Sequence, residues 1–145
     1  DPAATVRAAF AALSNLPESR VARSSSLYRT APVGIKEQPE FVNAVAELET
    51  ALAPEALLDQ LLEIEQRFGR IRAERNGPRT LDLDLLLYDN QVVELPRLTL
   101  PHPRLHLRAF VLQPLAEIAP ALAIPGRGTV AAWLPAVANQ GIVRL

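Results

Sequence analysis

An alternating run of leucine and aspartate between residues 81 and 88 constrains the fold more than any other stretch. Side chains alternate across a β-strand, which rises about 3.3 Å per residue, so Asp82 and Asp84 should project from one face roughly 6.6 Å apart. The leucines then line the other face. Turn signals flank the run at 77–78 and 89–90. The pattern predicts a strand over 81–88 with one apolar face and one acidic face.

The two aspartates suggest a metal site. Neighbouring carboxylates on one face repel each other, and Asp is depleted in strands, so a purely structural strand seldom carries it twice. Mg²⁺ takes hard oxygen ligands, often one or two carboxylates completed by substrate phosphates and water, and two carboxylates at this spacing can hold two ions. The alternative is an antiparallel strand with a solvated acidic face, and the Asp-x-Asp pattern alone leaves both open.

A basic segment with two glycines and a proline precedes the aspartates. Its arginines are Arg70, Arg72, Arg75 and Arg79. Guanidinium groups match phosphate oxygens in a bidentate manner, so such a loop beside paired carboxylates suits a polyphosphate. Glu65, one turn before the segment, is placed to pair with one of these arginines. The alternative is a solvated charge run with a routine surface ion pair.

Length and charge limit the function classes. A chain of 145 residues is typical of one domain, 1–145. Its 15 basic and 16 acidic residues give a net charge of −1, so we expect no nucleic-acid or membrane partner. No apolar run reaches the length of a membrane span. The lack of cysteine excludes disulfides and weakly favours a reducing compartment, and we expect a cytoplasmic protein.

Hydrophobic periodicity and helix-stop signals predict the elements. Helices are predicted over 2–14, 53–69, 104–113 and 129–137, and strands over 21–28, 41–50, 81–88 and 91–94. The turn at 89–90 should join the last two strands as a hairpin, and Trp133 should lie in the core. The order fits an α+β sandwich with a mainly antiparallel sheet and helices on one side. The loop over 30–39 has no periodicity, and we expect it to move.

Several side chains outside the acidic run suit a ligand. Asn43 should point away from the apolar side of its strand, where its amide can read a heterocycle edge; a solvated Asn is the alternative. His102 lies between two prolines that hold its backbone extended, so its ring can donate to a phosphate oxygen; a packed loop histidine is as compatible with the pattern. Arg108 and Phe110 differ by two positions, so only a helix end would let both touch one ligand.

Two segments together carry a resemblance to a known family. They read RIRAERNGPRTLDLD at 70–84 and LPHPRLHLRAFVLQPL at 100–115. The chain resembles 6-hydroxymethyl-7,8-dihydropterin pyrophosphokinase of folate biosynthesis, with further similarity at 25–34, 41–44 and 117–120. The resemblance implies a ferredoxin-like α+β fold and transfer of the terminal pyrophosphoryl group of ATP to the hydroxymethyl oxygen of the dihydropterin, with release of AMP.

The resemblance also implies roles for residues. Asp82 and Asp84 would hold two Mg²⁺ ions that bridge the phosphates of ATP, and with Arg70 and Arg79 they form the expected catalytic set. The nucleotide would be contacted by Arg70, Arg72, Arg75, Arg79, His102 and Arg108. The pterin would lie between Phe41 and Phe110 and near Asp82, with its edge read by Asn43, Thr30, Ala31 and Val33. Loops 30–40 and 69–80 would close over both substrates.

The sequence departs from the family pattern at three places. Asn76 stands where the family often has tryptophan, and Pro103 where it has an aromatic residue, which puts the seal of the lid and one nucleotide contact in question. Family members also begin with an apolar strand before the first helix, whereas this sequence opens on Asp1, the helix cap. We expect that strand to lie upstream of Asp1, and we expect a monomer unless another chain supplies it.

Two other functions stay open at this point. A metal-dependent phosphohydrolase needs the same aspartate pair with a positioned water in place of a pterin. A four-stranded α+β module can instead bind single-stranded RNA through aromatic residues on its sheet, although this sequence lacks the basic and aromatic strand pattern that such modules use.

Overall fold

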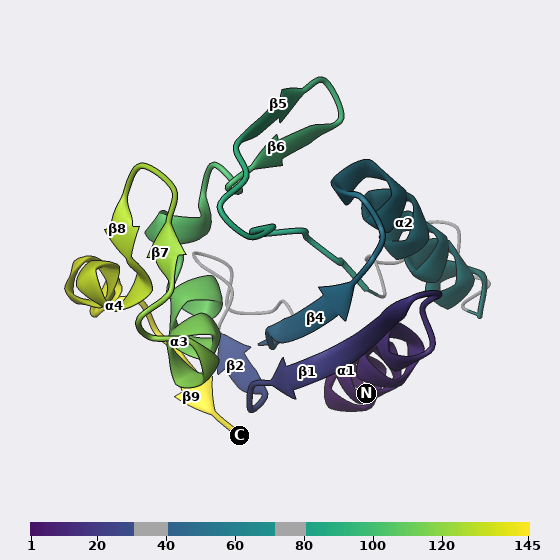
Figure 1. The fold of residues 1–145 in the computed structure, drawn as a ribbon. Coiled ribbons are helices and arrows are strands. Elements are labelled where there is room, and N and C mark those ends of the chain that lie inside the picture. The colour runs from purple at the N-terminus through teal and green to yellow at the C-terminus, as the bar shows by residue number, and fades with distance from the viewer. Residues whose placement is uncertain (31–40, 72–80) are drawn as a thin grey trace.

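The structure, a computed structural model, describes residues 1–30, 41–71 and 81–145 (Figure 1). The helices in this part are α1 (Pro2–Ser14), α2 (Pro54–Ile71), α3 (Ala109–Ile118) and α4 (Val130–Trp133). The strands are β1 (Ser19–Ser24), β2 (Tyr28–Thr30), β3 (Phe41–Asn43), β4 (Ala46–Thr50), β5 (Val93–Leu95), β6 (Leu98–Leu100), β7 (Ala123–Ile124), β8 (Gly128–Thr129) and β9 (Val143–Arg144). No helix in these residues combines the length and apolarity needed to cross a membrane.

Every described strand pair is antiparallel. Strand β1 pairs with β4, and β2 lies between β3 and β9. Two further hairpins are formed by β5 with β6 and by β7 with β8. Apolar residues of α1 and α2 pack against the inner side chains of β1 and β4. The predicted α+β class, with antiparallel strands and helices packed on them, is confirmed.

The first helix forms as the sequence predicts. The carboxylate of Asp1 accepts hydrogen bonds from the backbone amides of Ala3 and Ala4 at 3.1 and 3.4 Å, and Pro2 occupies the first helical position. Both features are typical of a helix start because they satisfy or remove amides that lack a partner in the helix. Ala9 and Leu13 are buried, and Leu13 belongs to the cluster against which Val21 of β1 and Leu48 of β4 pack.

The prediction of a strand over 81–88 is wrong, because the segment is not assigned to any strand. A strand requires a ladder of backbone bonds to a neighbour, and the backbone of this segment bonds elsewhere. The Leu83 amide donates to the side chain of Glu65, and the Leu86 carbonyl accepts from the His102 amide at 2.8 Å. The predicted alternation nevertheless holds, since Asp82 and Asp84 are exposed and the leucines are half-buried.

The predicted strand over 41–50 is divided in two at residues 44–45. The Ser25 amide donates to the Val45 carbonyl at 2.8 Å, and the Val45 amide donates to Ser25 Oγ at 2.9 Å. Val45 is thereby turned into the core, and the phase of the alternation changes there. The predicted strand over 21–28 is interrupted at the same point, so β1 pairs with β4 and β2 with β3 as separate ladders.

Other predicted boundaries shift. The turn at 89–90 exists, since the Gln91 amide donates to the Tyr88 carbonyl at 3.0 Å, but the hairpin that follows pairs β5 with β6. Helix α2 passes through Gly69, because the cost of glycine in a helix, about 1 kcal/mol, is outweighed by packing of its apolar face. Helix α3 passes through the buried Pro114 to Ile118. The predicted helix over 129–137 is α4 followed by a 3₁₀ turn that begins before Pro135.

Two hydrophobic clusters form the core, and the aspartate segment joins them. The first cluster centres on α2 and includes Leu57, Leu61 and Ile64; the second centres on α3 and includes Leu105, Leu112 and Leu115. Against the first pack Leu81, Leu83, Leu85 and Tyr88, and against the second pack Leu86 and Leu87. Figure 1 shows this segment running from beside β4 and α2 toward β5. Its apolar contacts fix it between the two halves of the protein.

Candidate active site

The two aspartates are presented to solvent by a segment held from its other side. Asp82 and Asp84 flank Leu83, whose side chain packs on the first cluster and whose amide donates to Glu65 Oε2 on α2 at 2.5 Å. Because the backbone at Leu83 is bound toward the core, the neighbouring carboxylates point the opposite way. The sequence predicted an ion pair between Glu65 and an arginine of the basic segment, and the side chains of those arginines lie outside the described part of the chain.

His102 lies next to this segment. Its amide bonds the carbonyl of Leu86, and its half-buried ring accepts a 3.2 Å hydrogen bond at Nδ1 from the Arg104 amide. The ring proton then resides on Nε2, which is a donor. Burial lowers the pKa of His102; the carboxylate of Asp84 opposes this shift, and the cations of Arg108 and Arg104 add to it. A neutral imidazole donor thus lies within electrostatic range of Asp84 and Arg108.

Arg108 and Phe110 meet at the start of α3. Arg108 is the N-cap residue with an extended backbone, φ −125° and ψ 118°, and its guanidinium carbon is 5.3 Å from the centre of the Phe110 ring. This is the helix end that the sequence required for both side chains to reach one ligand. The predicted helix entry at residue 104 is wrong, because residues 105–107 form a separate 3₁₀ turn and the chain straightens at Arg108.

The predicted pterin residues Thr30, Phe41 and Asn43 share one face of the β2–β3 ladder. Thr30 is the register partner of Phe41, Tyr28 is that of Asn43, and Asn43 Nδ2 lies 3.5 Å from Thr30 Oγ1. Direct cross-strand partners project to the same side of a sheet. The ring of Phe41 is 56% exposed, so it is available to stack on a flat ligand.

Some of the predicted site residues lie outside the part of the chain that the structure describes. Those outside the described residues are Ala31, Val33, Arg72, Arg75, Asn76 and Arg79, together with the greater part of the loops 30–40 and 69–80. Arg70 is in the last turn of α2, and its side chain lies outside the description. The described site residues therefore fall into two groups: Asp82, Asp84, His102, Arg108 and Phe110 around the aspartate segment and the start of α3, and Thr30, Phe41 and Asn43 on the sheet.

Within residues 1–30, 41–71 and 81–145, no group of three or more His, Cys, Asp or Glu side chains is placed to hold a metal. The donor set at Asp82 and Asp84 is a pair of carboxylates. Hard oxygen donors in this number suit Mg²⁺ whose remaining ligands are phosphate oxygens and water. They do not suit a metal that needs a closed set of protein ligands, such as structural zinc.

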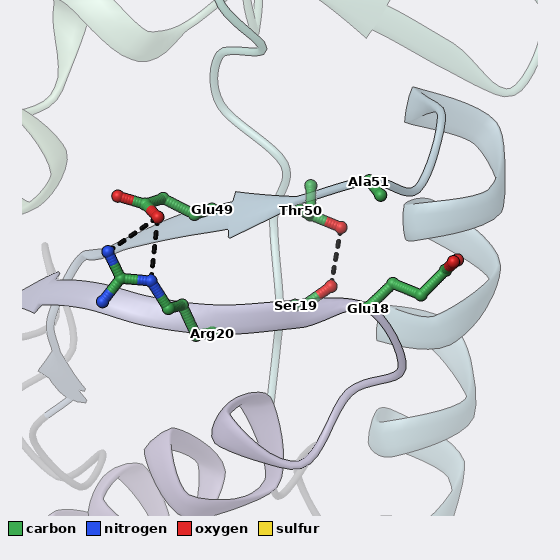
Figure 2. Close-up of a pocket in the computed structure, with 6 residues that line it drawn as sticks. All are labelled: Glu18, Ser19, Arg20, Glu49, Thr50 and Ala51. Atoms are coloured by element: carbon green, nitrogen blue, oxygen red, sulfur yellow. Dashed lines mark hydrogen bonds and ion pairs between the residues drawn. The ribbon is translucent and has the colours of Figure 1, made fainter.

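The surface hollow drawn in Figure 2 is a different place. It has a volume of about 460 Å³ and lies at the end of the β1–β4 pair, lined by Glu18, Ser19, Arg20, Glu49, Thr50 and Ala51. Arg20 pairs with Glu49 at 2.7 Å, and Ser19 Oγ lies 2.6 Å from Thr50 Oγ1. These polar groups satisfy one another, and none belongs to the predicted site.

Sequence reasoning missed one polar group at the site. The amide of Arg104 fixes the tautomer of His102, and its side-chain charge helps lower the pKa of that ring. Its position two residues after His102 and the stiff turn set by the flanking prolines were visible in the sequence, but the bond from the Arg104 amide to the ring was not predicted.

Comparisons with known proteins give a consistent result. A family model for 7,8-dihydro-6-hydroxymethylpterin-pyrophosphokinase matches residues 1–120. Three relatives carry the name 2-amino-4-hydroxy-6-hydroxymethyldihydropteridine pyrophosphokinase. The protein of Pseudomonas aeruginosa is 48% identical over 145 residues, which cover 100% of this chain and 90% of the relative. The protein of Haemophilus influenzae is 42% identical over 144 residues, which cover 99% of this chain and 90% of the relative. The protein of Methylorubrum extorquens is 44% identical over 145 residues, which cover 100% of this chain and 91% of the relative.

Proposed function

The chain belongs to the 7,8-dihydro-6-hydroxymethylpterin-pyrophosphokinase family, and from this premise we propose its reaction in detail. It is an ATP-dependent pyrophosphokinase of folate biosynthesis. The hydroxymethyl oxygen of the dihydropterin attacks the β-phosphorus of ATP, the bond from that phosphorus to the α-phosphate oxygen breaks, AMP leaves and the hydroxyl proton is released. Asp82 and Asp84 hold Mg²⁺ during this transfer.

One observation supports this proposal most. The charges of Asp84, a proposed metal ligand, and of Arg108, a proposed phosphate contact, both act on the ring of His102, although Asp84 precedes His102 by 18 positions in the sequence. The backbone bond from His102 to Leu86 and the position of Arg108 at the start of α3 hold the three side chains around one region. A carboxylate, a neutral donor and a cation are the groups that a metal-bound polyphosphate needs.

The metal completes the acidic side of this arrangement. Mg²⁺ supplies charge neutralisation and orientation of the phosphates when bound. The chain contributes the exposed carboxylates of Asp82 and Asp84, whose backbone is fixed by the bond between Leu83 and Glu65. Because both carboxylates lie on one side of a held segment, little rearrangement of the protein is needed to bind the ion.

The remaining residues act by binding and positioning. His102 donates from Nε2 to a phosphate oxygen, and Arg108 places a positive charge near the phosphates. Phe41 and Phe110 stack on the pterin while Asn43, Thr30, Ala31 and Val33 read its edge. Arg70, Arg72, Arg75 and Arg79 bind the phosphates from the basic loop. Rate enhancement then comes from alignment of the two substrates and neutralisation of charge, without a covalent intermediate.

The loops at 30–40 and 69–80 close over the substrates and exclude water that would otherwise hydrolyse ATP. The partners are two small molecules, ATP and the hydroxymethyldihydropterin, and we propose a cytoplasmic monomer with no nucleic-acid or membrane partner. The net charge of −1 is consistent with this assignment.

A single assay tests the proposal against its alternatives. Purified protein is incubated with ATP and Mg²⁺, with and without 6-hydroxymethyl-7,8-dihydropterin, and the nucleotides are separated and quantified. AMP that forms only with the pterin, in equal amount to the pyrophosphorylated pterin, supports the pyrophosphokinase. Nucleotide hydrolysis without the pterin would instead identify a phosphohydrolase, and no turnover together with tight binding of single-stranded RNA would identify a binding module.

A further inference from the structure

Glu117, near the end of α3, joins this helix to two strands and to the connection between β1 and β2. Its carboxylate accepts from the Ser26 amide at 3.0 and 2.9 Å, from Ser26 Oγ at 3.0 Å and from the Tyr28 hydroxyl at 2.6 Å. Arg144 of β9 pairs with it at 2.9 Å, and the side chain of Glu117 is 22% exposed. Figure 1 shows α3 beside β2 and β9, where these bonds lie.

The charge of Glu117 is strongly stabilised there. Partial desolvation by itself would raise the pKa of this carboxyl, but the hydrogen bonds from Tyr28, Ser26 and Arg144 outweigh it and lower the pKa. A carboxylate that accepts this many bonds holds its donors in a narrow range of positions. It is therefore a stiff link between the helix and the sheet.

The sheet end of the link leads to the proposed pterin residues. Tyr28 is the register partner of Asn43 on one side and of Arg144 on the other. These three side chains project to the same face of the sheet, and so do Thr30 and Phe41 two positions along the strands. Glu117 contacts the sheet on this face, because it binds both Tyr28 and Arg144.

The helix end of the link leads to Phe110. Glu117 lies seven positions after Phe110, which is close to two helical turns. Both side chains therefore lie on the same side of α3, about 10.5 Å apart along its axis. Pro114 lies between them and has no amide to bond the Phe110 carbonyl. Phe110 and Glu117 are therefore coupled through the remaining backbone bonds of α3 and through the buried residues Val111, Leu112 and Leu115, which hold both parts of the helix on the same cluster.

We propose that Glu117 is a positioning residue for the pterin slot, setting through Tyr28 and Ser26 the separation of Phe110 on α3 from Phe41 and Asn43 on β3. The inference rests on the proposed function, since it takes these three residues as the walls of the slot. A flat ring stacks favourably only when both walls lie at van der Waals distance, about 3.5–4 Å from it. A small displacement of α3 therefore weakens pterin binding.

The positions of the residues proposed to bind Mg²⁺ and ATP depend less on the Glu117 link. Asp82 and Asp84 are held by Glu65 and by the two clusters, and His102 is held by Leu86. None of these contacts involves Glu117 or Tyr28. Arg108 caps α3 and moves with Phe110, but it is one of several proposed phosphate contacts. Loss of the link should thus weaken pterin binding more than nucleotide binding, whereas a general loss of structure would weaken both alike.

Two variants test the link from its two ends, Glu117→Gln and the milder Tyr28→Phe. Binding of the fluorescent probe 6-hydroxymethylpterin is measured in the presence of a non-hydrolysable ATP analogue, and binding of that analogue is measured alone. We expect the Kd and the KM for the pterin to rise roughly three- to tenfold, because each variant loses a hydrogen bond to a charged group. The Kd for the ATP analogue, and kcat at saturating pterin, should stay within about twofold of the wild-type values. The double variant should bind the pterin no more weakly than the weaker single variant.

Val137→Ala is the matched control for stability. Val137 is buried in the cluster around α3 and has no part in the link, so its truncation lowers the unfolding temperature while leaving pterin Kd unchanged. Unchanged pterin affinity in both link variants would overturn the inference. Equal weakening of pterin binding and nucleotide binding in the link variants would also overturn it. So would a Val137→Ala variant that loses as much stability as the link variants and binds the pterin as weakly as they do.

Failure of the proposed function has a separate signature. If the proposed function is wrong, the wild-type protein will neither bind 6-hydroxymethylpterin nor form AMP. The positioning role of Glu117 would then be rejected together with the proposed function. A wild-type protein that binds the pterin and forms AMP, combined with link variants that bind it equally well, rejects the role of Glu117 alone.

Discussion

The backbone amide of Leu83 donates a 2.5 Å hydrogen bond to Oε2 of Glu65, so the residue between the two aspartates is fastened to α2 by a side chain. In a strand this amide would bond to a neighbouring backbone carbonyl. Here a carboxylate from a helix takes that place, and it acts on the position that decides which way Asp82 and Asp84 point. Glu65 thus helps to orient the acidic pair, together with the leucines that pack on the two clusters.

Glu65→Ala should impair metal binding and stability together. Removal of the acceptor leaves the half-buried Leu83 amide without this partner, at a cost of about 1–3 kcal/mol in the free energy of unfolding. The Mg²⁺ concentration for half-maximal AMP formation should rise, because the aspartates lose their support. Urea denaturation and a Mg²⁺ titration measure both effects, with the exposed Glu63→Ala on the same helix as control. A Glu65→Ala protein with an unchanged Mg²⁺ requirement would show that the segment is oriented by its leucines alone.

Asp82→Asn and Asp84→Asn should each abolish AMP formation while leaving the fold intact. Both side chains are exposed, so the substitution removes no buried apolar group, and it replaces a charged metal ligand with a neutral one. Activity is measured at saturating Mg²⁺, and folding by circular dichroism and thermal unfolding. Asp89→Asn, an exposed substitution in the turn that follows, is the control and should keep full activity. Near-wild-type turnover in either variant would disprove the assignment of both carboxylates to the metal.

Phe41→Ala should weaken pterin binding without loss of stability. The ring is 56% exposed, so little buried area is lost, whereas removal of one stacking wall costs about 0.5–1.5 kcal/mol of binding beyond its contact area. Pterin Kd and unfolding temperature are compared with those of Val92→Ala, an exposed apolar control. Phe110→Ala should weaken the pterin as well, but with some loss of stability, since this ring packs on the second cluster. Equal weakening of ATP and pterin by Phe41→Ala would argue against the slot.

Arg79→Lys should lower turnover more than ATP affinity. Lysine keeps the charge but loses the planar fork that binds two phosphate oxygens at once, so transition-state stabilisation should fall by about 1–3 kcal/mol. Arg79 lies outside the described residues, and this prediction rests on the sequence. Steady-state kinetics measure kcat and the KM for ATP. An Arg79→Lys enzyme with unchanged kcat would indicate that the basic loop is only solvated.

The protein should lose stability as the pH falls below about 6.5, in part through His106. His106 is 7% exposed, and its Nδ1 has no hydrogen-bond partner among the described residues. Its neighbours include the edge of Trp133 and the cation of Arg127. Burial lowers the pKa of His106, and Arg127 lowers it further. The unfolded chain therefore binds this proton at a higher pH than the folded one, so the stabilisation is complete above the unfolded pKa and is lost as the pH falls toward the folded pKa.

His106→Phe separates this contribution from that of His102, whose pKa is also lowered. Phenylalanine keeps an aromatic contact with Trp133 and removes the titrating group. The slope of unfolding free energy against pH should be shallower in the variant than in wild type, by up to about 1.4 kcal/mol per pH unit between the two pKa values. Urea denaturation between pH 7.5 and 5 measures it, and identical slopes in the two proteins would contradict the prediction.

Local sequence determined much of the secondary structure and the facing of its residues. The cap of α1 was predictable because Asp1 and Pro2 act on amides within one turn. The exposure of Asp82 and Asp84 was predictable because alternation follows from the extended backbone, whether or not a ladder forms. The chemistry of the candidate site was likewise visible in the run of acidic and basic residues, with the family resemblance supplying the roles.

The tertiary structure decided what depends on residues far apart in the chain. The exchange between Ser25 and Val45 divides the long strands, and the bond from His102 to Leu86 brings the histidine beside Asp84. The link of Glu117 to Tyr28 spans 89 positions in the sequence. No periodicity within a window of residues records such contacts, because they arise only when separate elements bury their apolar faces against one another. The sequence therefore determined which groups are present and how they alternate within a segment, and tertiary packing decided where that alternation shifts, as at Val45, and which groups meet.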